Sequence, residues 1–210
     1  KDYPRAKLDA FISACAARRA LRDARVGTMG DRDMLLFGTQ YEGNSMRGQL
    51  GVEVEPYEML EMVRALDTLE PDKIAEGVKY VKENWKFEKP CDEAIIEKGV
   101  KYALAIGKKI TERGWAAITL LDVDGMKKLE GFPPAMVFIL LEHYYHVLTT
   151  PENDVMGCVT QLIMKYLSGQ TVPYLEYYEF FENSVIAGVT DYNPEHVTDV
   201  PVSVLPAACG

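Results

Sequence analysis

Acidic side chains stand at two points of the chain where they could do chemistry. Glu130 lies in the segment "DGMKKLEGFPP", and Glu152, Asn153 and Asp154 directly precede a long apolar run. Glu130 and Asp154 are 24 residues apart. Two carboxylates could share a hard divalent cation, which prefers oxygen ligands, or they could flank a substrate carbon as acid and base. The spacing has no metal signature of its own, so both alternatives stay open.

The second acidic group also has a purely structural interpretation. Thr150 is a residue type that caps helices, and Pro151 suits a first helical position. Glu152 and Asp154 would then stabilise the positive end of the helix dipole by about 0.3 to 1 kcal/mol each. On this interpretation, the acids start a helix and perform no reaction.

Histidine and glycine patterns indicate little chemistry. His143 and His146 are three residues apart in "LEHYYHVL" and could face one side of a helix, but zinc would need further ligands, and the surrounding aromatics favour a core or interface position. His196 has no evident partner in "NPEH". The "GTMG" segment lacks the dinucleotide pattern GxGxxG and is typical of a turn after a strand.

The overall composition excludes several classes of protein. The chain has 210 residues, of which 48% are hydrophobic, and a net charge of -9, so we expect a soluble globular protein without a nucleic-acid partner. The longest strongly apolar stretch, 135–141, is too short for a membrane span, and no leader opens the chain. We therefore expect a cytoplasmic protein with reduced cysteines, because the four cysteines are widely spaced: Cys15, Cys91, Cys158 and Cys209.

The elements that must position the acids alternate between helices and strands. Apolar spacing predicts helices at 6–22, 57–66, 70–85, 92–112 and 134–147, and strands at 24–30, 50–56 and 115–123. Pro56 should stop the second strand, and residues 31–49 should form a long loop. Such alternation is typical of a parallel sheet covered by helices, whose ligands bind at the carboxyl ends of the strands. The segment after Val123 should therefore belong to a site.

An aromatic segment follows the acidic group and its apolar run. Residues 171–189 alternate as strands do, and the aromatics from Tyr174 to Phe181 favour sheet core or a subunit interface over a stacking platform. We divide the chain into a leading helix or linker (1–22), an α/β domain that carries the acids (23–170) and a β segment (171–210).

Taken in order, these segments resemble the L-fucose isomerase and L-arabinose isomerase superfamily. The resemblance covers about residues 20 to 195 and includes "ARVGTMG", "LGVEVEPYEMLEMV", "WAAITLLDV", Glu130, "PPA", "TPENDVMGCVTQLIMKYLSGQ" and "EYYEF". Its most specific part is "END" followed by a helix that ends in "LSG". The resemblance implies a subunit with an N-terminal Rossmann-like domain, a second α/β domain of similar type and a C-terminal barrel-like domain. On this interpretation, the chain covers the second domain and the start of the following region, and lacks the other two domains.

The same resemblance implies an activity and its residues. Members interconvert aldoses and ketoses through a cis-enediol, with Mn²⁺ or a similar divalent ion, and are homo-oligomers that act on small sugars. Glu130 and Asp154 correspond to two metal ligands that also move a proton between C1 and C2. A third ligand, a histidine, is expected beyond Gly210, and neither His143 nor His146 takes its place. The chain alone would hold half a metal site and be inactive.

Two alternatives compete with the isomerase interpretation. The chain could be a sugar-binding or regulatory relative that keeps the sheet without the chemistry. It could also be a structural domain that builds an oligomer through its aromatic face, in which case charges at Tyr177 or Phe181 should dissociate the assembly.

Overall fold

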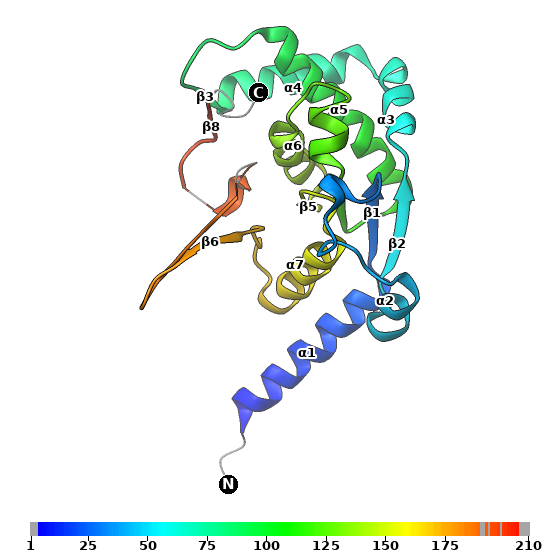
Figure 1. Cartoon of the computed structure of the whole chain (residues 1–210), viewed down its shortest axis with the longest axis vertical. Coiled ribbons are helices and arrows are strands. Elements are labelled where there is room, and N and C mark those ends of the chain that lie inside the picture. The colour runs from blue at the N-terminus through cyan, green and yellow to red at the C-terminus, as the bar shows by residue number, and fades with distance from the viewer. Residues whose placement is uncertain (1–3, 190–191, 193, 198, 206–210) are drawn as a thin grey trace.

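The computed structural model describes residues 4–189, 192, 194–197 and 199–205. Its centre is a four-stranded, wholly parallel sheet in the order β2-β1-β4-β5 (Figure 1). The strands are β1 (Arg25–Met29), β2 (Glu53–Tyr57), β4 (Ala117–Leu120) and β5 (Leu148–Thr150). The α/β class with a parallel sheet flanked by helices is therefore confirmed, while the C-terminal barrel-like domain stays a prediction.

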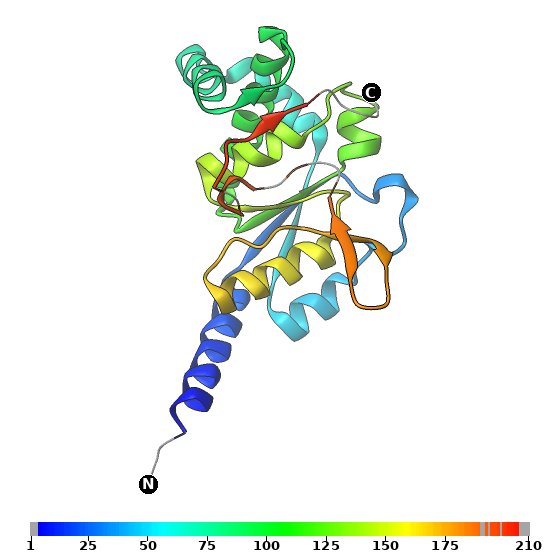
Figure 2. The same cartoon turned by 90° about the vertical axis from the view of Figure 1, so that its left-hand side faces the viewer.

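Helices cover both faces of this sheet. Met29 and Leu120 point into one core with α3 (Met59–Ala65), α4 (Pro71–Asn84), α5 (Glu93–Arg113) and α6 (Ala135–Tyr145). Val26 and Ala117 point into a second core with α1 (Arg5–Asp23), α2 (Gly43–Leu50) and α7 (Val155–Ser168). This division follows from the two-residue period of a strand, since successive side chains face opposite sides. Figure 2 shows the two layers with the sheet between them.

Local sequence sets the bounds of the best-predicted helix, α5. The Asp92 side chain accepts a hydrogen bond from Ala94 N at 3.0 Å, and Gly114 closes the helix in the left-handed conformation. An acid at the N-cap and a glycine after the last turn satisfy the backbone groups that a helix end leaves open.

Two predictions between β1 and α3 are wrong. Pro56 does not stop β2 but pairs with Thr28 inside it, since β2 is an edge strand and a proline there loses no ladder hydrogen bond on the open side. The predicted loop at 31–49 contains most of α2. The Glu42 side chain caps this helix by accepting from Asn44 N and Ser45 N.

The start of α7 also differs from the prediction. Thr150 is the last residue of β5, which pairs with β4, and its hydroxyl donates to Gln161 Oε1 at 2.7 Å. It is therefore not a helix cap, and Pro151 is not the first helical residue. The cap is Asp154, which accepts from Gly157 N at 2.8 Å. Sequence analysis did not identify β5 because its three residues adjoin the helix pattern of α6.

The predicted strand at 115–123 is shorter than expected. It ends at Leu120, and residues Asp122–Lys127 form a π-helical turn. The reason lies in another loop, since the Asp33 carboxylate accepts from Val123 N and Asp124 N, each at 2.8 Å, and so bends the chain away from the sheet.

The segment after α7 forms strands as predicted, but not in the core. The antiparallel hairpin of β6 (Glu176–Phe180) and β7 (Val185–Gly188) extends from the body (Figures 1 and 2), and its aromatic side chains are exposed. The core interpretation of these aromatics is wrong, and the interface interpretation stays a prediction. Farther on, β8 (Ser203–Val204) returns to the body and pairs in parallel with β3 (Lys86–Phe87).

Two further observations concern predictions based on composition. Within the described residues, no helix combines the length and apolar character that a bilayer span needs. Cys15, Cys91 and Cys158 are free thiols, while Cys209 lies outside the described residues.

Candidate functional site

The loops after β1, β4 and β5 meet at the carboxyl end of the sheet. Asn153 joins all three: its N-H donates to Leu120 O at 2.8 Å, its Oδ1 accepts from the Thr28 hydroxyl at 2.7 Å, and its Nδ2 donates to Asp31 O. Asn153 and Thr28 are both buried. The backbone and side chain of one residue thus hold three strand ends together.

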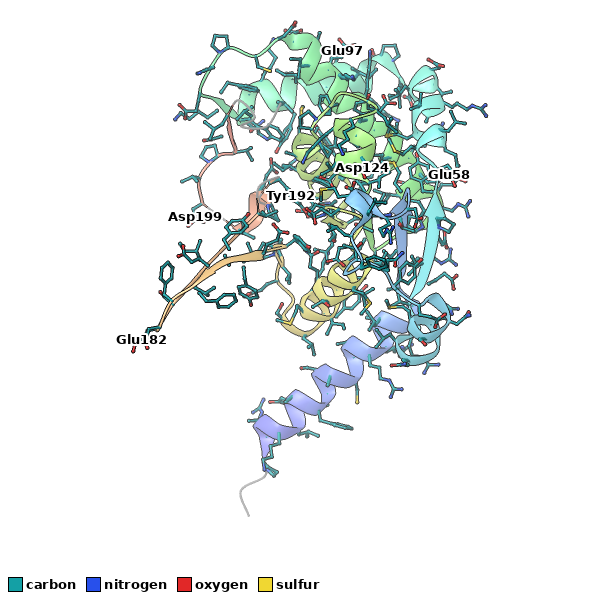
Figure 3. All side chains as sticks on the ribbon, viewed as in Figure 1. Glu58, Glu97, Asp124, Glu182, Tyr192 and Asp199 are labelled. Carbon is teal, nitrogen blue, oxygen red and sulfur yellow. The ribbon has the colours of Figure 1, made fainter. Side chains whose placement is uncertain are left out.

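A second set of contacts ties the β1 loop to the turn after β4. Besides its bonds to that turn, the fully buried Asp33 accepts from Met34 N at 3.0 Å, and Met34 N also donates to Asp124 Oδ2 at 2.8 Å. Lys128 pairs with Asp124 Oδ1 at 2.6 Å. Figure 3 shows Asp124 beside the loop that follows β1. The acids of this region therefore also serve as connectors between loops.

Backbone strain is concentrated in the same place. Glu152 and Asn153 have φ of 57° and 51°, and Met34 and Leu35 in the β1 loop have φ of 46° and 58°. Non-glycine residues seldom adopt such angles, which cost about 1 to 3 kcal/mol each and cluster at functional sites. The Glu152 N-H donates to Asp122 Oδ1 at 2.5 Å, and Asp122 is fully buried with Lys127 Nζ at 3.3 Å. The surrounding contacts hold the strained turn in place.

Asp154 is half-buried at the N-terminus of α7. Its Oδ1 accepts from Gly157 N, and its Oδ2 accepts from the Tyr174 hydroxyl at 3.2 Å. A Cβ on Gly157 would come within 2.5 Å of Asp154 Oδ2 and 2.9 Å of the Tyr174 ring, so only glycine leaves room for this pair. Burial and the nearby Asp154 charge raise the pKa of Tyr174, which keeps its hydroxyl proton available to the carboxylate.

Glu130 is also half-buried and has a tyrosine partner. The Tyr102 hydroxyl of α5 donates to Glu130 Oε2 at 2.7 Å, and Lys98 Nζ donates to the Glu130 carbonyl at 2.8 Å. Burial, followed by the bond to Glu130, raises the pKa of Tyr102. Each of the two acids named by sequence analysis therefore accepts a phenolic hydrogen bond.

The two acids follow neighbouring strands, but they are anchored in different layers. Glu130 is bound to Tyr102, a member of the core that contains α5, whereas Asp154 caps α7 on the other face of the sheet. Among the hydrogen bonds and ion pairs of the described residues, none joins Glu130 to Asp154. The link between their loops is indirect and runs through the bonds of Asn153 to Leu120 and of Glu152 to Asp122.

The donor set fits a hard divalent cation in type but supplies few ligands. Carboxylate oxygens are the ligands that Mn²⁺ and Mg²⁺ prefer. In the described part of the chain, no group of three or more His, Cys, Asp or Glu side chains is arranged to hold a metal ion. Glu130 and Asp154 could thus provide two ligands, and the remaining ligands would have to come from outside the described residues.

The histidines lie elsewhere. His143 Nδ1 is 2.8 Å from Glu195 Oε2, and its ring stacks on Tyr80 at a centroid distance of 4.2 Å. His146 is exposed and follows α6 in the left-handed conformation, so the two histidines do not share a helix face as expected. The side chain of His196 lies outside what the structure describes. The core interpretation of His143 and His146 is therefore wrong, and their interface role stays a prediction.

Sequence analysis missed the residues that organise this end of the sheet. Asn153 was noted only as a neighbour of the acids, and Asp33 and Tyr174 were not assigned to the site. The available signals were the long polar loop after β1 and the amide placed between two acids. The partners themselves could not be found, because the Thr28 and Asn153 side chains are 125 residues apart along the chain.

Comparison with known proteins adds no assignment. No family model matches the chain, and no curated protein matches it in sequence.

Proposed function

We propose that the chain is the acid-bearing α/β part of an aldose-ketose isomerase, in which Glu130 and Asp154 serve one divalent cation, Mn²⁺ or a similar ion, and one sugar. The observation that supports this most is positional: the two acids follow β4 and β5, adjacent parallel strands whose loops are hydrogen-bonded to each other. Sites of α/β sheets form at such strand ends.

The bound cation would supply the electrostatic stabilisation that makes removal of a proton next to a carbonyl feasible. Asp154 has both oxygens held, one by Gly157 N and the other by Tyr174. A carboxylate fixed at a helix N-terminus suits a constant ligand role, because the helix dipole favours its negative charge.

Glu130 suits the proton-moving role. Its Oε2 accepts from Tyr102, and Gly131, which follows it, has a φ of 61°. A carboxylate with one hydrogen bond from a phenol keeps lone pairs for a proton from the substrate. We assign to Glu130 the transfer of a proton between C1 and C2, and to Tyr102 the orientation of Glu130.

Turnover tests this assignment. Full-length protein that contains this chain, supplied with Mn²⁺ and a panel of pentoses and deoxyhexoses, should interconvert one aldose and ketose pair. Glu130→Gln and Asp154→Asn should each lower kcat by at least about a hundredfold without unfolding the protein, since each removes an acid that acts in the reaction. Glu97→Gln, at a half-buried position whose carboxylate pairs with Lys101, and Asp67→Asn, at an exposed position, are matched controls that should keep wild-type turnover.

Two results would contradict the proposal. Wild-type turnover in either Glu130→Gln or Asp154→Asn would remove that residue from the reaction. Sugar binding that needs no metal and leads to no turnover would favour a non-catalytic sugar-binding protein.

A further inference from the structure

The outer half of α1 has an apolar stripe that the body of the molecule does not cover. Residues 4–16 are all exposed, and α1 extends from the body of the molecule (Figures 1 and 2). Leu8, Phe11 and Ile12 have exposed fractions of 39%, 67% and 55%. Such spacing places the three side chains on one face of a helix.

This stripe is not a continuation of the face that α1 packs on the body. The buried residues of α1 are Ala17 and Leu21. At 3.6 residues per turn, their direction differs from that of Leu8, Phe11 and Ile12 by about 150° around the helix axis. The helix therefore has two apolar faces, one for its own body and one for something else.

The hairpin β6–β7 also has apolar side chains that the body of the molecule does not cover. Tyr177, Phe180 and Val185, which lie on one face of the hairpin, are 69%, 73% and 44% exposed. A β-bulge between Tyr177 and Glu179 shifts the alternation, and the Tyr177 and Phe180 rings lie 5.5 Å apart. An isolated two-stranded hairpin is at best marginally stable in water, so its exposed apolar face gains from being covered.

The charges around the two surfaces are opposite. The exposed charged residues beside the α1 stripe are mostly basic: Arg5, Lys7, Arg18 and Arg19 stand against one acid, Asp9, which lies 3.7 Å from Arg5. The hairpin has only acids as charged residues: Glu176, Glu179 and Glu182. Figure 3 shows Glu182 at the free tip of the hairpin, away from the body. In a chain of net charge -9, the excess of basic residues on α1 makes this helix electrostatically complementary to the acidic hairpin of a second copy.

We propose that the β6–β7 hairpin of one copy binds the outer half of α1 of a second copy. Phe11 and Ile12 would pack on Tyr177 and Phe180, and the basic residues of the helix would pair with the hairpin glutamates. The contact joins two different surfaces, so it produces either a reciprocal dimer or a ring. The inference is independent of the proposed isomerase function.

Sedimentation velocity over a range of protein concentrations tests the contact. The wild-type chain should associate, whereas Phe11→Glu and Phe180→Glu should each sediment as monomers with unchanged circular dichroism. Leu60→Glu, at a 59% exposed position on α3, is the matched control and should associate like wild type. Because the contact is between charged surfaces, association should also weaken as salt is raised.

Mixing the two monomeric variants distinguishes this contact from every symmetric one. The Phe180→Glu copy keeps an intact helix and the Phe11→Glu copy keeps an intact hairpin, so the mixture should regain a two-chain species. A monomeric wild type, normal association of Phe11→Glu, loss of association in Leu60→Glu or a mixture that stays monomeric would each overturn the proposal. Normal association of Phe11→Glu with loss in Phe180→Glu would indicate hairpin-to-hairpin pairing or a different partner helix.

Discussion

The carboxyl end of the sheet and the β6–β7 hairpin are built in opposite ways. At the sheet end, polar side chains such as Asn153, Asp33 and Asp122 are buried and engaged by neighbouring loops. In the hairpin, apolar side chains such as Phe180 are exposed. Buried polar groups are costly unless paired, and exposed apolar groups are costly unless covered.

The two regions differ in whether their contacts are satisfied within the chain. Four non-glycine loop residues at the sheet end adopt positive φ, and hydrogen bonds from three segments hold them there. The hairpin has one internal ladder and no buried side chain. The contacts of the first region are therefore complete within the chain, whereas the second region keeps its apolar side chains exposed.

The largest expected effect is the loss of stability on replacing Asn153 at the carboxyl end of the sheet. Asn153→Ala leaves the Thr28 hydroxyl and the Asp31 carbonyl without their partner and puts alanine at a φ of 51°. We expect a loss of about 3 to 5 kcal/mol in the free energy of unfolding. Urea denaturation measures it, with Asn44→Ala, an exposed amide on α2, as the control that should change by less than about 0.5 kcal/mol. Equal effects of the two variants would contradict the connector role of Asn153.

The next effect concerns a buried acid behind β5. Burial raises the pKa of Glu142 to about 7, against opposing hydrogen bonds from Thr149 and Tyr192. The folded state then holds a proton that the unfolded state has released, so this contribution to stability is complete below pH 4.5 and is lost as the pH rises toward 7. The loss is on the order of 3 kcal/mol.

Glu142→Gln isolates this contribution, because glutamine does not titrate. The free energy of unfolding of the variant, minus that of wild type, should increase from pH 4.5 to 7 and then level off. Denaturation curves across this range check it. A difference that stays constant with pH would show that folding leaves the pKa of Glu142 unchanged.

A smaller effect should come from filling the space beside Asp154. Gly157→Ala brings a Cβ against Asp154 Oδ2 and the Tyr174 ring, so one of them must move, at a cost of about 1 to 3 kcal/mol. Gly48→Ala in α2, which meets nothing within 4 Å, should instead stabilise by about 0.5 to 1 kcal/mol. Thermal unfolding of both variants gives the comparison, and loss of stability in Gly48→Ala alone would contradict it.

The smallest effect is expected in the hairpin. Phe180→Ala should change the free energy of unfolding by less than about 0.5 kcal/mol at concentrations where the chain is monomeric, because the side chain is 73% exposed. We expect this substitution to weaken association between copies instead. A large loss of stability in the monomer would show that the Phe180 side chain is covered within its own copy.

The sequence predicts the helices and the sheet class well, because these depend on local periodicity. The apolar stripe of α5, its Asp92 cap and Gly114 are all readable within one segment. The start of α7 was misassigned, since Thr150, Pro151 and Asp154 are each acceptable near a helix start. Only the pairing of β5 with β4, a long-range contact, decides that Asp154 is the cap.

For the candidate site, the sequence predicts the strand ends that its acids follow but not the contacts around them. Parallel strands predict a site at their carboxyl ends, and Glu130 and Asp154 follow two of them. The tyrosine partners Tyr102 and Tyr174 come from other elements, and no spacing rule identifies them. The sequence also does not predict that the aromatic side chains of the hairpin are exposed, because a covered strand has the same alternation of residue types.

Titration with Mn²⁺, followed by the electron paramagnetic resonance signal of the free ion, tests the central claim most directly. If Glu130 and Asp154 serve one cation, the full-length protein that contains this chain should bind one ion per subunit, and Glu130→Gln and Asp154→Asn should each weaken that binding by at least about tenfold, with little further loss in the double variant. Glu97→Gln and Asp67→Asn should bind like wild type. Two ions on the wild type and one on each single variant would mean separate sites, and unchanged binding in either variant would remove that acid from the metal site.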